Sequence, residues 1–87
     1  MARYKRKGPK KLAGKLREIR LRMDMTQQEV ADALGTDASS VSRFERGIRE
    51  PSLLEMLEYY KLSGVGIDLL IDDKRDLAKK RGRLLSL

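Results

Sequence analysis

The feature that most constrains the fold of this chain is a pair of short helical segments separated by only three residues. Thr26 and Glu29 have the spacing of a capping box, in which each side chain accepts from the other residue's backbone amide. The helix that starts there should end at Gly35, because glycine readily adopts the left-handed conformation of a helix terminus. A second helix is expected at residues 38–46, before Gly47. Two helices joined by so short a turn cannot lie antiparallel, so the second must project away from the first.

Apolar periodicity and caps predict three further helices. Leucine, isoleucine and methionine recur every three or four residues from 12 to 23, which indicates one buried helical face. Ser52 and Glu55 form a second capping box, so a helix should run from 53 to about 62. A short apolar helix is expected at 67–71, and no segment alternates as a strand would. These patterns predict an all-α fold, a compact bundle of about five short helices.

Composition excludes most enzyme chemistry. The chain has 87 residues, a length that suits one small domain. It contains neither Cys nor His, which removes thiolate nucleophiles, disulfides, the commonest zinc ligands and the usual general base. We therefore expect no enzyme activity, no cofactor and no metal site. No apolar stretch approaches the roughly 20 residues that span a bilayer, and the basic start lacks a secretory apolar core, so a cytoplasmic protein is expected.

Charge is distributed unevenly along the chain. Residues 1–22 hold ten Lys or Arg and one Glu, whereas residues 23–73 hold four basic and eleven acidic residues. Residues 74–87 again hold six basic residues and one acid. The net charge of +7 and the two basic ends favour a polyanionic partner such as nucleic acid. The alternative is that the basic ends only keep the chain soluble.

Three regions follow from these patterns. Residues 1–11 should form a basic arm, because Gly8-Pro9 breaks any helix and no apolar periodicity is present. Residues 12–71 should form the helical domain. Residues 72–87 form a basic, leucine-containing extension, which is either an amphipathic helix or an extended tail; Gly82 argues against one long helix.

Four short motifs follow one another in the helical region. They are Thr26-Gln27-Gln28-Glu29-Val30-Ala31, Leu34-Gly35, Ser40-Val41-Ser42-Arg43-Phe44-Glu45-Arg46-Gly47 and Pro51-Ser52-Leu53. None is specific alone, but their order and spacing over residues 12–70 resemble the Cro and phage-repressor type of helix-turn-helix domain, also called the xenobiotic-response-element family. The resemblance implies a lambda-repressor-like fold and a transcriptional regulator, expected to be a repressor, that binds double-stranded DNA sequence-specifically. A helix of residues 38–46 is about 13 Å long, which suits the major groove.

The resemblance places the base-contacting side chains on the helix of residues 38–46. These side chains are Ala38, Ser39, Ser42 and Arg43. Arg43 can donate to both O6 and N7 of a guanine, and Ala38 can touch a thymine methyl group. The alternative for Arg43 is an interaction with a phosphate or with a nearby Glu. Asp37 is expected to cap this helix, although its carboxylate could also accept from N4 of a cytosine.

The resemblance also implies contacts to the DNA backbone and one structural ion pair. Gln27 resembles the Gln that clamps a phosphate against a helix start; its alternative is a solvated residue of the first turn. Arg20 and Glu45 resemble an ion pair that joins the first and third helices and orients the recognition helix, with Arg22 as a competitor. The expected backbone contacts are Gln27, Ser40, Arg46, Arg49, Arg3, Lys5, Arg6 and Lys7.

One module of this size usually binds DNA with modest affinity, so we expect a homodimer on a near-palindromic site. Leu54 and Leu62 lie eight residues apart at positions that depart from the family pattern, and they should share a helical face. The expected dimer contacts are Leu54, Leu62, Leu77 and Leu84. The competing interpretation is that these leucines cover their own domain's core. The alternative function is an antitoxin or adaptor whose C-terminal segment grips another protein, with DNA binding secondary.

Overall fold

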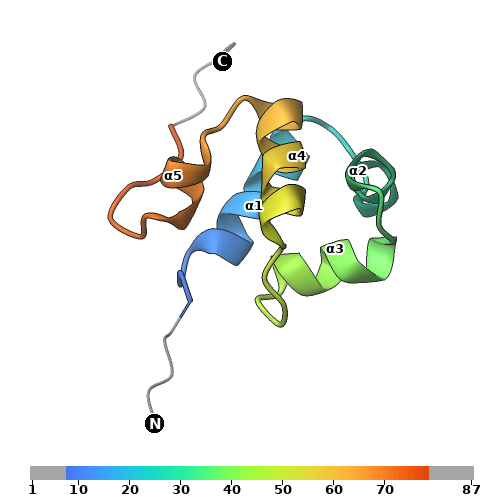
Figure 1. Ribbon diagram of the computed structural model, residues 1–87. Helices are drawn as coiled ribbons and strands as arrows, with labels where there is room; N and C mark the ends of the chain where they lie inside the picture. The colour runs from blue at the N-terminus through green and yellow to red at the C-terminus, as the bar shows by residue number, and fades with distance from the viewer. Residues whose placement is uncertain (1–7, 79–87) are drawn as a thin grey trace, which may run out of the picture.

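The computed structural model describes residues 8–78 of the chain. It contains five α-helices and, within this described range, no strand. In chain order the helices are α1 Leu12–Arg22, α2 Gln27–Leu34, α3 Ala38–Glu45, α4 Leu53–Ser63 and α5 Ile67–Ile71 (Figure 1). The all-α prediction is confirmed, and each helix begins and ends within one residue of its predicted position.

Side-chain caps explain where three of the helices begin. Thr26 and Ser52 each accept from the amide of the Glu three residues later, and that Glu accepts from the amide of the cap in return. Asp37 caps α3 by accepting from the amide of Ser40 at 2.8 Å. Gly35 has a φ of +75°, a left-handed conformation that costs other residues about 1–2 kcal/mol, and it ends α2. These local interactions fix the length of α2 and the start of α3.

The five helices enclose one core of mainly aliphatic side chains. Helix α3 packs on α2 and α1, α4 contacts α2, and α5 contacts both α1 and α4 (Figure 1). Tyr59 is the largest side chain in the core, and its buried hydroxyl has no hydrogen-bond partner among residues 8–78. The buried apolar residues are Leu12, Leu16, Ile19, Val30, Ala31, Val41, Phe44, Met56, Tyr59 and Leu70.

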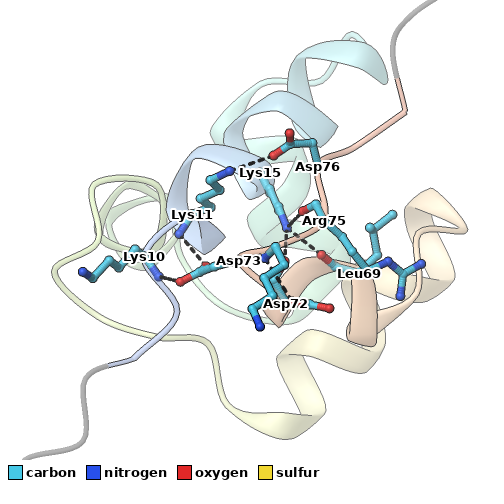
Figure 2. A network of polar contacts seen from close by, with 9 residues as sticks. Lys10, Lys11, Lys15, Leu69, Asp72, Asp73, Arg75 and Asp76 are labelled. Carbon is cyan, nitrogen blue, oxygen red and sulfur yellow. Dashed lines mark hydrogen bonds and ion pairs between the residues drawn. The ribbon is translucent and has the colours of Figure 1, made fainter.

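The chain after α5 folds back onto α1 and is not helical from residue 72 to residue 78. Leu77, one of the expected dimer contacts, is half-buried and packs against the core of its own domain, as the competing interpretation expects. It reaches the core because hydrogen bonds tie the segment before it to the start of α1 (Figure 2). Leu84, another expected dimer residue, lies outside the described residues. Within residues 8–78 no helix has the length and hydrophobicity needed to cross a membrane.

Candidate nucleic-acid interface

Helix α3 buries one side and presents the other to solvent. Val41, Phe44 and Glu45 point inward, as their spacing predicted. The opposite side is small and polar, so a partner could approach the helix backbone closely, and its cations lie toward the C-terminal end. Its exposed or half-buried residues are Ala38, Ser39, Ser42, Arg43 and Arg46.

Arg43 and Arg46 have guanidinium groups that are available for a partner. In the part of the chain that the structure describes, neither makes a side-chain hydrogen bond or an ion pair, whereas Arg20, Arg22 and Arg49 all do. A guanidinium carries five N–H donors in one plane, which match a phosphate or the two acceptors on the edge of a guanine. The solvent side of α3 therefore offers unused donors next to small side chains.

The N-terminus of α3 carries a negative charge. The Asp37 carboxylate accepts from the backbone amide of Ser40, which holds the pKa of Asp37 below its usual value, and the nearby Arg43 and Arg49 lower it further. The carboxylate is therefore ionised at neutral pH, and the expected cap is confirmed. A phosphate would be repelled at this end of the helix, whereas the amino group of a base would not.

Arg20 and Glu45 join α1 to α3 through a bidentate ion pair. Nε and Nη2 of Arg20 donate to the two carboxylate oxygens of Glu45 at 2.7 and 3.0 Å, and the side chains are only 12% and 3% exposed. Nη1 of Arg20 donates to the carbonyl of Met25 at 3.0 Å. Arg22, the competing residue, pairs with Glu18 on its own helix. The bidentate geometry restrains how α3 is rotated against α1, and with the buried Val41 and Phe44 it keeps the opposite side of α3 toward solvent.

Gln27 connects the same ion pair to the start of α2. Its Nε2 donates to Oε1 of Glu45 at 3.1 Å, so this half-buried side chain is held at the helix N-terminus. An amide nitrogen carries two hydrogens, and the second remains for another acceptor. The position therefore suits an interaction with a phosphate.

The side chains of Ser40 and Arg49 are hydrogen-bonded to each other. Ser40 is buried, and its hydroxyl accepts from Nη1 of Arg49 at 3.1 Å. The guanidinium of Arg49 also lies 5.1 Å from the ring centre of Phe44 and 3.9 Å from the Glu55 carboxylate. These interactions tie the loop after α3 back onto the helix, so Ser40 does not lie on the solvent side of α3, where a DNA-backbone contact was expected. The expected arm residues Arg3, Lys5, Arg6 and Lys7 lie outside the described residues.

Helix α4 exposes an apolar surface that the sequence pattern revealed only in part. Leu53 and Leu54 are 77% and 73% exposed, and Leu57 and Tyr60 continue the same side of the helix. We call these four residues the α4 apolar face. Leu62, which was expected beside Leu54, is half-buried and lies outside this face. The spacing of Leu53, Leu57 and Tyr60 at i, i+4 and i+7 is the signal that would have revealed it.

A family model described as helix-turn-helix matches residues 16–70, which is well over half of the chain. A search of curated proteins finds a similar sequence in the cryptic phage CTXphi transcriptional repressor RstR of Vibrio cholerae. The two are 31% identical over 61 residues, which cover 70% of this chain and 55% of RstR. The chain therefore spans little more than half the length of that relative.

Two solved structures superpose on the helices of this chain. The P22 c2 repressor in complex with a synthetic operator superposes with a TM-score of 0.68 at 21% identity, over 71% of this chain and 94% of that one. The restriction-modification controller protein C.AhdI from Aeromonas hydrophila superposes with a TM-score of 0.59 at 32% identity, over 64% of this chain and 85% of that one.

Proposed function

The chain belongs to the helix-turn-helix family of the Cro and phage-repressor type, and we propose that it is a sequence-specific, double-stranded-DNA-binding transcriptional repressor. The observation that carries the proposal is the solvent side of α3, where Arg43 and Arg46 have no partner within residues 8–78. RstR and P22 c2 are both named repressors, which supports repression rather than activation. The proposal includes no catalytic step, and it places the protein in the cytoplasm.

Helix α3 enters the major groove and reads base edges. Arg43 is exposed and donates to O6 and N7 of a guanine. Ala38, Ser39 and Ser42 are short enough to let the helix backbone approach, and Ala38 meets a thymine methyl. The ionised Asp37 disfavours a phosphate at the start of α3, and its carboxylate can accept from N4 of a cytosine.

Contacts to the DNA backbone set the register of α3. Gln27 donates its second amide hydrogen to a phosphate at the start of α2, where the helix dipole adds favourable potential. Arg46 binds a second phosphate at the end of α3, and the basic arm binds further ones. Ser40 and Arg49 act mainly within the domain, since their hydrogen bond holds the loop after α3; Arg49 remains exposed enough to touch a phosphate as well.

Two copies of the chain contact each other through the α4 apolar face. The dimer that they form binds one near-palindromic site. The face lies on α4, whereas the groove-reading side chains lie on α3, so an interface through α4 leaves both recognition helices free. In such a dimer the two α3 helices enter successive turns of the major groove, with centres about 34 Å apart. Single exposed leucines are common on protein surfaces. Four exposed apolar side chains on one side of a helix form a contiguous patch, which more often marks an interface.

Substitution of Arg43 tests base recognition. We expect Arg43→Ala to cost about 1–3 kcal/mol on the best site and little on random DNA, because the variant cannot make the bidentate hydrogen bonds to a base. Arg43→Lys is the matched control: it keeps the charge but not the planar fork, so affinity for random DNA stays while discrimination falls. Titration of both duplexes by fluorescence anisotropy measures the two affinities. Equal reductions on specific and random DNA would show that Arg43 binds a phosphate and would contradict base reading by this residue.

A further inference from the structure

Helix α1 touches the C-terminal end of α3 at two points (Figure 1). A Cβ atom on Gly47, which follows the last turn of α3, would lie 3.7 Å from the Cβ of Ala13 in the first turn of α1. Two turns further along α1, Arg20 binds Glu45, the last residue of α3. Ala13 and Arg20 therefore mark the side of α1 that faces the end of α3.

Arg17 lies on this side of α1, between the two points of contact. It follows Ala13 by four residues and precedes Arg20 by three, and side chains at these spacings are neighbours on a helix. The side chain of Arg20 is only 12% exposed, whereas Arg17 is an exposed residue. Arg17 therefore lies at the solvent edge of the contact between α1 and the end of α3.

No acidic side chain neutralises Arg17 from within its own helix. None of the residues three or four positions away from it is Asp or Glu. Its side chain makes no hydrogen bond or ion pair within residues 8–78. Arg22 differs, because its Nε donates to Glu18 at 3.0 Å, one turn earlier on α1. In the described part of the chain, α1 thus exposes one paired arginine and one arginine without a partner.

Arg17 adds a third guanidinium group to the C-terminal end of α3. Arg43 lies in the last turn of that helix and Arg46 ends it, and both are exposed without a partner in the described range. Cations that share one region repel each other, and an anionic chain that binds them removes this repulsion. The ionised Asp37 lies at the opposite end of α3. The end of α3 next to α1 is therefore the end that suits a polyanion.

Building on the proposed function, we propose that Arg17 is a further contact to the DNA backbone, which extends the DNA-binding surface from α3 onto α1. Its guanidinium binds a phosphate beside the one that Arg46 reaches. Contacts of this kind hold a protein in register on the duplex but read no bases. Arg17 therefore adds affinity and salt dependence, and it adds no sequence preference.

Arg22 provides the matched control for Arg17. Arg17→Gln and Arg22→Gln remove the same charge from the same helix, and Arg22→Gln also leaves Glu18 without its cation. If only the net charge of the protein mattered, Arg22→Gln would weaken DNA binding at least as much as Arg17→Gln.

We expect the opposite order. Arg17→Gln should weaken binding about five- to tenfold at about 0.1 M salt, and it should make the dependence of log K on log salt shallower by about 0.9 for each bound copy of the chain. Arg22→Gln should keep the slope of the unchanged protein. Arg17→Lys should retain most of the affinity and the slope, because an ammonium group also binds a phosphate.

Fluorescence anisotropy measures the affinities of the full chain and the three variants over a range of salt concentrations, for a selected duplex and for a random one. The reduction in Arg17→Gln should be the same on both duplexes, because a phosphate contact does not depend on the base sequence. Urea unfolding of each variant serves as the test of folding. The midpoint should stay the same in Arg17→Gln, because the exposed side chain has no partner within residues 8–78 to lose.

Three results would overturn the proposal. In the first, Arg17→Gln and Arg22→Gln weaken binding equally and with the same slope, so that Arg17 acts through net charge alone. In the second, Arg17→Lys binds as weakly as Arg17→Gln. In the third, Arg17→Gln reduces the preference for the selected duplex over random DNA.

Failure of the proposed function gives a different result. If no duplex is preferred, or if Arg43→Ala leaves the preference unchanged, base reading by α3 is contradicted. The comparison of Arg17→Gln with Arg22→Gln on random DNA still decides whether Arg17 binds a phosphate. A chain that binds neither duplex would contradict both proposals.

Discussion

Helices α3 and α4 both expose one side to solvent, but the chemistry of the two sides is opposite. On α3 the exposed side chains are small and polar or are guanidinium groups without a partner in the described range. On α4 they are Leu53, Leu54, Leu57 and Tyr60. A polar, cationic side suits a phosphate-lined groove, and an apolar side suits another protein surface. One small domain therefore carries two exposed sides of different chemistry on consecutive helices, and we propose a different partner for each.

The two sides depend on the same interior. Glu45 lies on the inner side of α3, where it binds Arg20 and Gln27. Tyr59 lies on the inner side of α4. Burial raises the pKa of its hydroxyl, and the nearby Glu45 carboxylate raises that pKa further. A change in this interior should affect both surfaces, whereas a change on one exposed side should affect one function only.

The largest effect is expected from breaking the buried ion pair. Glu45→Ala leaves the guanidinium of Arg20 nearly buried without its carboxylate, which should reduce the free energy of unfolding by about 3–5 kcal/mol. Both DNA binding and dimer formation should weaken with it. Urea unfolding followed by circular dichroism measures the reduction. Glu18→Ala is the control, because it removes the exposed pair with Arg22 and should cost less than about 1 kcal/mol; equal costs would contradict the role of Glu45.

A charge on the α4 apolar face should separate the two functions. Leu54→Glu is expected to weaken the dimer by about 2 kcal/mol, roughly 30-fold, because a carboxylate must be desolvated at the interface. Leu21→Glu makes the same change at an exposed leucine on α1 and should have no effect. Sedimentation equilibrium of the full chain and both variants measures this. A full chain that is monomeric at tens of micromolar, or a Leu54→Glu variant that remains dimeric, would show that this face is not the interface.

The smallest change in stability is expected at Tyr59, in the core beneath the exposed sides of α3 and α4. Tyr59→Phe removes a buried hydroxyl that has no partner within residues 8–78, so it should stabilise the fold by about 1 kcal/mol. Burial raises the pKa of this hydroxyl, so its neutral form is favoured in the folded state. The wild type should therefore hold its stability below pH about 10, the unfolded value, and lose some above it, whereas the variant should not. A destabilised variant would reveal a partner for the hydroxyl.

Local patterns predicted the five helices and their bounds, because helix caps and helical spacing are local features of the sequence. The capping boxes at Thr26 and Ser52 and the stop at Gly35 each depend on residues within one helical turn. The inward direction of Val41 and Phe44 follows from helical spacing in the same way. The sequence alone therefore predicts which side of α3 is exposed and proposed to contact bases, because it is the side opposite these buried residues.

Interactions between distant residues were not predictable from such patterns. The fold-back of residues 72–78 depends on Lys15 and Asp73, which pair with atoms more than fifty residues away. The packing of Leu77 on its own core follows from this fold-back, so local spacing could not choose between that packing and a subunit contact. Ser40 was expected at the DNA backbone, yet the long side chain of Arg49 reaches back to its hydroxyl. Each case requires knowing where a polar side chain from another segment lies.

Selection of bound duplexes from a random pool by the full chain tests DNA reading by α3 and dimer formation by α4 together. We expect an enriched inverted repeat with half-sites about 10 base pairs apart, centre to centre. Run in parallel, Leu54→Glu should enrich a single half-site without the repeat, and Arg43→Lys should keep the spacing but relax one or two base pairs. An unenriched pool, or a repeat that Leu54→Glu leaves intact, would contradict the assignment of these two functions to the two helices.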